Sequence, residues 1–191
     1  MAEHVCPWWM GYLIDNPLRR LIHNPEKILG PYVKPEMTVI DVGCGMGFFS
    51  IAMAKMVGDQ GQVIAVDLQQ KMLDGMRRRA EKAGVAARIH AHRCEADNLN
   101  IDTEADFVLA FAMVHEVPDT KRLLSQVYAC LKPGGKFLVA EPRLHVPTSS
   151  FQRMLEIAAA VGFWQSAEQP QVRRCYAVVF VKTDPVSKSD S

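Results

Sequence analysis

Residues 39–50 read VIDVGCGMGFFS, and this stretch decides the fold: an apolar run and an acid precede three glycines at alternate positions. Each glycine adds chain entropy that folding must overcome, so glycines this dense are expected where backbone approaches a ligand closely. The apolar residues predict a short strand over 39–42, and the aromatic residues begin a helix predicted over 48–57. The stretch therefore predicts a strand, a ligand-binding loop and a helix in succession.

The same alternation continues along the chain. Further strands are predicted over 62–66, 88–92, 107–111, 136–140, 163–167 and 175–181, and further helices over 70–83, 120–131 and 149–161. The sequence KPGG at 132–135 is predicted to end a helix and turn into the next strand. Alternating strands and helices imply a parallel sheet covered on both faces. The last two strands are joined without a helix, so one of them is predicted to be antiparallel. The predicted fold class is a Rossmann-like, doubly wound α/β fold with a mostly parallel seven-stranded sheet.

Composition excludes several classes of protein. The 191 residues are 49% hydrophobic and 23% charged, which is typical of a globular domain, and the formal charge of +1 argues against a broad nucleic-acid-binding surface. No apolar run reaches the roughly 20 residues that a bilayer span needs. Five scattered cysteines without a Cys-x-x-Cys pair favour free thiols in a reducing cytoplasm. We expect a helical extension over 1–35, a catalytic domain over 36–182, and a disordered polar tail over 183–191.

The glycine loop distinguishes between two classes of ligand. A dinucleotide-binding loop needs Gly-x-Gly-x-x-Gly, but here Gly43, Gly45 and Gly47 are followed by Phe48 where the last glycine is required. Asp41 precedes the first glycine by two residues. A carboxylate there would repel a pyrophosphate but would suit a ligand that carries an ammonium group. The loop therefore favours a nucleoside with a cationic end.

These segments resemble those of the class I S-adenosylmethionine-dependent methyltransferases. DVGCGMGFFS is similar to the first motif of that family, VIAVDLQQKML to the second, and LKPGGKFLVAEP to the segment around its fifth strand. The resemblance implies S-adenosylmethionine as cofactor, with S-adenosylhomocysteine as product. It assigns Asp67 to the ribose hydroxyls, Glu95 and the Ala96 amide to the adenine, and Leu68 and Phe111 to the walls of the cofactor pocket.

The segment after the fourth strand, FAMVHEVPD, is expected to face the methyl group. It lacks the Asn/Asp-Pro-Pro-aromatic stretch of amino-methylating enzymes and is more similar to the quinone and arsenite methyltransferase branches. His115 is the best candidate base, because imidazole titrates near neutral pH; lining the pocket is the alternative. Glu141 is a second candidate catalytic residue, able to bind or deprotonate substrate or to cap a helix. Glu116 and Arg143 are placed in the substrate pocket.

The predicted activity is methyl transfer to a small, fairly apolar acceptor. The alternatives are a thiol or metalloid methyltransferase, or a module that binds S-adenosylmethionine without catalysis. No metal site is expected, because His90 and His92 have no further ligands at metal-like spacing.

The predicted α/β core does not require the aromatic N-terminal segment. Trp8, Trp9 and Tyr12 would form an exposed apolar patch if nothing covered them. We expect this segment to close over the cofactor crevice as a lid and to line the substrate pocket. Permanent packing on the flank of the sheet, membrane contact and homodimerisation are the alternatives, and the oligomeric state stays open.

Overall fold

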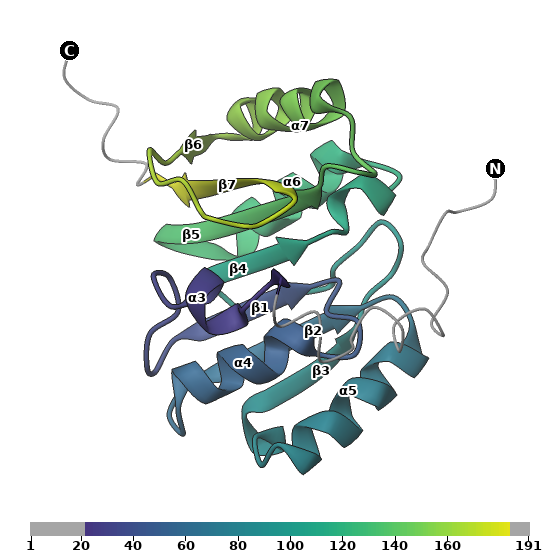
Figure 1. Ribbon diagram of the computed structural model, residues 1–191, viewed down its shortest axis with the longest axis vertical. Helices are drawn as coiled ribbons and strands as arrows, with labels where there is room; N and C mark the ends of the chain where they lie inside the picture. The colour runs from purple at the N-terminus through teal and green to yellow at the C-terminus, as the bar shows by residue number, and fades with distance from the viewer. Residues whose placement is uncertain (1–21, 184–191) are drawn as a thin grey trace.

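The computed structural model describes residues 22–183, which form a seven-stranded sheet with helices on both faces (Figure 1). The strand order is β3-β2-β1-β4-β5-β7-β6. The strands are β1 (Thr38–Val42), β2 (Gln62–Asp67), β3 (Ile89–Arg93), β4 (Ala105–Phe111), β5 (Leu131–Pro142), β6 (Phe163–Gln165) and β7 (Cys175–Lys182). β7 is antiparallel to both neighbours, and the other pairings are parallel. The predicted fold class is confirmed.

Two hydrophobic clusters lie on opposite faces of this sheet. The helices are α3 (Pro25–Leu29), α4 (Phe48–Val57), α5 (Gln70–Lys82), α6 (Thr120–Cys130) and α7 (Thr148–Val161), with 3₁₀ turns η1 (Ala86–Arg88) and η2 (Val114–Glu116). α3, α4 and α5 bury side chains in one cluster, whereas α6 and α7 bury theirs in the other. The strand order reverses between β1 and β4, and in open α/β sheets ligands bind beyond the carboxyl ends of the strands at such a point.

Several predicted boundaries differ from the structure, most clearly those of β5 and β6. The sequence pattern predicts Leu131 in a helix and 132–135 in a turn, but β5 begins at Leu131, which pairs with Ala105 before the register shifts. The Leu131 side chain is fully buried, so its place in the sheet overrides the helical pattern. The strand predicted over 163–167 ends at Gln165.

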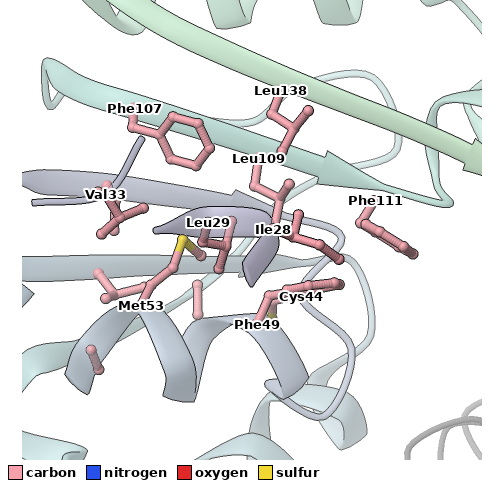
Figure 2. Packing of buried hydrophobic residues seen from close by; sticks show 14 of the residues in the cluster. Ile28, Leu29, Val33, Cys44, Phe49, Met53, Phe107, Leu109, Phe111 and Leu138 are labelled. Atoms are coloured by element: carbon pink, nitrogen blue, oxygen red, sulfur yellow. The ribbon is translucent and has the colours of Figure 1, made fainter. Parts of the chain in front are cut away.

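The short helix α3 contributes to the core rather than lying apart from it. Ile28, Leu29 and Val33 are buried against the cluster that α4 and β4 share, as Figure 2 shows for Leu29 near Met53 and Phe107. Residues 1–21, with Trp8, Trp9 and Tyr12, lie outside the described residues, as do 184–191. The division at residue 35, the lid and the disordered tail stay predictions. Over residues 22–183, no helix has the length and apolar character to cross a bilayer.

Candidate active site

The glycine loop after β1 leaves open space on one side. The amides of Gly43 and Cys44 both donate to the Val66 carbonyl, each at 2.9 Å, which ties the loop to β2. Gly45 has a φ of +53°, and a Cβ built on it would meet no described atom within 4 Å. Gly47 has a φ of +82°, and a Cβ there would lie 2.5 Å from Cγ of Met76. Gly45 therefore borders space that a ligand can fill, whereas Gly47 is required for packing of the loop on α5.

Asp67 ends β2 and faces this loop. Its Oδ2 accepts a hydrogen bond from the Gly45 amide at 2.9 Å, and its Oδ1 accepts one from the Gln69 amide at 2.8 Å. Burial raises the pKa of Asp67, and the two amide bonds partly offset the rise. A carboxylate offers about four acceptor positions, so two remain for the hydroxyls of a ribose. The adjacent Leu68 is half-buried.

Asp41 lies beneath the loop rather than on its open side. It is 2% exposed, and its Oδ2 accepts a hydrogen bond from the hydroxyl of Ser50 on α4. Its negative charge can still favour a cationic ligand above it, because charges interact strongly in a buried setting. The assignment of Asp41 to the cofactor stays a prediction.

The 94–99 loop (Cys94–Leu99) follows β3 and borders Asp67, whose carbonyl accepts from the Cys94 amide at 3.2 Å. Glu95 and Ala96 are exposed on it, as a contact with an adenine requires. Burial raises the pKa of Cys94 to about 11, so this thiol stays protonated at neutral pH. The loop is thus adjacent to Asp67, in the order expected for ribose and then adenine.

The chain leaves β4 through a constrained turn. Phe111 is buried against Phe49, with ring centroids 4.6 Å apart. The next residue, Ala112, has a φ of +57°, which is unfavourable for a residue with a Cβ. Its amide donates to the Ala140 carbonyl at 2.8 Å. Backbone conformations of this kind persist where surrounding contacts hold them, and they cluster at functional sites.

Glu141 supplies those contacts from the neighbouring strand β5. Its Oε1 accepts from the amides of Met113 at 3.1 Å and Val114 at 2.9 Å, and its Oε2 is hydrogen-bonded to Nδ1 of His115. Glu141 is 2% exposed and caps the N-terminus of η2, one of the predicted alternatives. Its oxygens face protein groups, which argues against direct contact with substrate.

His115 is therefore held at Nδ1, and its side chain stays partly exposed. The side chain of His115 is 26% exposed, and its Nε2 lies 4.0 Å from Oε1 of Glu116. The hydrogen bond to Glu141 raises the pKa of His115, and its burial opposes this rise. A partly exposed histidine held by a carboxylate is the arrangement of a general base with an orienting group.

Arg143 is fixed at the same edge, just beyond Glu141. Its Nε donates to the Cys175 carbonyl at 3.1 Å, and its guanidinium lies 5.1 Å from the ring centroid of Tyr176. Arg143 is otherwise exposed, so its outer nitrogens can reach an acceptor. Among residues 22–183, no three His, Cys, Asp or Glu side chains are grouped so as to hold a metal.

Several hydrogen-bond and ion-pair partners in the site have no signal in the sequence. Ser50, which holds Asp41, lies on the helix that follows the glycine loop, whereas Gln126 and Arg122 reach the 94–99 loop from a helix more than 20 residues away in sequence. The order of strands in the sheet decides which helix lies beside which loop.

The methyltransferase domain family matches residues 33–174. The chain belongs to this family. Ubiquinone/menaquinone biosynthesis C-methyltransferase of Vibrio campbellii is 31% identical over 109 residues, which are 56% of this chain and 42% of the relative. Demethylmenaquinone methyltransferase of Lactobacillus johnsonii is 34% identical over 110 residues, 57% of this chain and 45% of the relative. The chain thus spans less than half the length of these curated relatives.

Solved structures agree with the family. An S-adenosylmethionine-dependent methyltransferase from Aquifex aeolicus has a TM-score of 0.83 at 22% identity, covering 94% of this chain and 100% of that one. An S-adenosylmethionine-dependent O-methyltransferase from Thermotoga maritima has a TM-score of 0.68 at 20% identity, covering 84% and 65%. The identification as a class I methyltransferase domain with S-adenosylmethionine as cofactor is confirmed. The roles of individual residues stay predictions.

Proposed function

We propose that the chain transfers the methyl group of S-adenosylmethionine to a small, fairly apolar acceptor whose attacking atom carries a proton. The observation that carries this proposal is the His115–Glu141 pair beside the carboxyl end of β4. An acceptor that already has a free lone pair, such as a thiolate, needs no base, whereas a hydroxyl or an acidic carbon does. The pair supports the protic acceptor.

The residues in and around the glycine loop fit the cofactor. Gly45 leaves open space, Asp67 keeps acceptor positions for ribose hydroxyls, and Glu95 and Ala96 are exposed for the adenine. Phe111 lies at the base of the site, Leu68 beside Asp67, and the charge of Asp41 favours the cationic end. When bound, S-adenosylmethionine supplies an electrophilic methyl group.

The remaining residues act on the acceptor. Nε2 of His115 takes the proton from the attacking atom, and Glu141 holds the imidazole in the tautomer that leaves this nitrogen unprotonated. Glu116 lies beside Nε2, and Arg143 can bind a polar group of the acceptor. Leu144, 93% exposed on the turn after β5, offers an apolar surface at the same edge. The quinone-pathway names of the curated relatives support an aromatic acceptor such as a quinol or phenol.

The thiol or metalloid alternative has less support. Among the described residues Cys44, Cys130 and Cys175 are buried, and burial raises the pKa of Cys94 and of Cys130 to about 11. These thiols do not offer an exposed thiolate to bind a metalloid. The cysteines support the predicted cytoplasmic location, because those of residues 22–183 are free thiols.

Transfer of a radiolabelled methyl group tests the proposal. The protein is incubated with methyl-labelled S-adenosylmethionine and a panel of quinols, phenols, thiols and arsenite. We expect label in organic-extractable products of the quinols or phenols, and much less label with Asp67→Ala when S-adenosylmethionine is below saturation. Binding of S-adenosylhomocysteine without transfer to any acceptor would favour the non-catalytic module, and labelled thiol or arsenic products would favour the alternative class.

A further inference from the structure

The 94–99 loop is held by a side chain of α6, a helix that packs on the opposite face of the sheet from α4 and α5. Oε1 of Gln126, on α6, accepts from the Leu99 amide at 2.6 Å, and its Nε2 donates to the Asp97 carbonyl at 2.9 Å. The orientation of the Gln126 amide is unambiguous, because one backbone partner is a donor and the other an acceptor. One side chain thus fixes two backbone positions of the loop that carries Glu95 and Ala96.

Other contacts fix the same loop less directly. Nε2 of His92 is hydrogen-bonded to the Leu99 carbonyl at 2.9 Å, so both backbone groups of Leu99 have partners. Arg122, one turn before Gln126, forms an ion pair with Asp97 at 2.9 Å, with both side chains 52% exposed. Exposed pairs contribute little. Gln126 is therefore the contact from α6 that sets the path of the backbone.

We propose that Gln126 is a positioning residue for adenine recognition: it holds the 94–99 loop so that Glu95 can accept from the exocyclic amino group. The proposal rests on the assignment of Glu95 and Ala96 to the adenine. Within the loop, Glu95 and Asn98 exchange backbone hydrogen bonds at 2.9 and 3.4 Å, so the position of Glu95 depends on the residues that Gln126 anchors. Without Gln126 the loop amide and carbonyl turn to water, and Glu95 loses its fixed position.

The test compares two ligands that differ at a single group. S-adenosylhomocysteine presents an amino donor to Glu95, whereas its purine analogue, with hydrogen in place of that amino group, presents no donor there and keeps N1 as an acceptor. Titration calorimetry gives the ratio of the two dissociation constants for each variant. Both ligands bind only the folded protein. Partial unfolding therefore raises both apparent dissociation constants by the same factor and does not change their ratio.

For the wild type we expect a preference of at least about tenfold for S-adenosylhomocysteine, since a hydrogen bond from the amino group to a carboxylate is charge-assisted. Gln126→Met removes both hydrogen bonds at similar volume, and the preference should fall to about threefold or less. Ser125→Ala, which removes only a bond to the Lys121 carbonyl of the same helix, and Arg122→Gln should keep it. In Glu95→Ala the preference is lost, and adding Gln126→Met should change it no further.

Each outcome has one meaning. A Gln126→Met protein that discriminates like the wild type overturns the proposal, and so does additivity with Glu95→Ala. A wild type that binds both ligands equally overturns it by removing the adenine contact of Glu95, while methyl transfer in the radiolabel assay would leave the proposed function standing. Absence of binding to either ligand would overturn the proposed function itself.

Discussion

Replacing Glu141 by Gln separates the two tasks of this residue. The Oε1 of the new amide can still accept from the amides of Met113 and Val114, so the turn after β4 keeps its support. The NH₂ group then faces Nδ1 of His115, where Oε2 stood. An NH₂ group can only donate, so Nδ1 must become the acceptor and the imidazole proton moves to Nε2. His115 then has no lone pair on the nitrogen that faces the acceptor.

The expected loss follows from this change of tautomer. A positioned base contributes roughly 10²–10⁴ in rate, so kcat should fall at least about 100-fold, equivalent to about 2.7 kcal/mol. His115→Ala should lose a similar amount. The dissociation constant for S-adenosylhomocysteine should stay within about twofold of wild type, because neither residue touches the cofactor loop.

The pH profile provides a second measurement. A base acts when neutral, and Glu141 raises the pKa of His115, so wild-type kcat/KM should rise with pH through a midpoint above the ordinary value of about 6.5. Glu141→Gln removes the negative partner, so any residual rise should move to lower pH. Glu116→Gln, 4.0 Å from Nε2, is the matched control and should shift the midpoint only slightly. Activity of Glu141→Gln within about threefold of wild type, with an unchanged profile, would refute the base assignment.

Three further changes test the cofactor side and the N-terminus. Asp67→Ala should weaken S-adenosylhomocysteine binding by about 1.5–3 kcal/mol in calorimetry and, because Asp67 also holds the Gly45 amide, lower the melting temperature; unchanged affinity would contradict the ribose assignment. Gly45→Ala should weaken binding with a stability loss of only about 1–2 kcal/mol, whereas Gly47→Ala should destabilise more because its Cβ meets Met76; equal melting temperatures would contradict this ranking. The double change Trp8→Ala with Trp9→Ala should reduce methyl transfer far more than thermal stability, and the reverse pattern would exclude the lid.

Local sequence patterns were sufficient to predict the fold, because each strand and helix is encoded by its own residues. The alternation of apolar strands and amphipathic helices, punctuated by glycines, predicted the seven strands and the antiparallel hairpin. The errors fall where tertiary contacts override a local pattern, as at Leu131, which pairs with Ala105 in the sheet. The 3₁₀ turn η2 was missed for a related reason, because its cap is Glu141, more than 20 residues away.

The candidate site was harder to predict because its geometry depends on pairs of neighbouring strands. Register aligns Val42 with Val66 and Phe111 with Ala140, so the next residues, Gly43 beside Asp67 and Ala112 beside Glu141, occupy equivalent places. In both pairs the first residue has a positive φ, and its amide donates to the carbonyl that precedes the acid.

Each acid then holds the loop that follows the adjacent strand. Asp67 accepts from the Gly45 amide of the glycine loop, and Glu141 accepts from the Met113 and Val114 amides of the turn after β4. β1 and β4, whose loops are held, are the two strands between which the order reverses. The crevice is thus built from two similar halves, each with a buried acid supplied by the outer neighbour. Because the halves carry different side chains, loss of Asp67 should act mainly on cofactor affinity and loss of Glu141 mainly on turnover and its pH dependence.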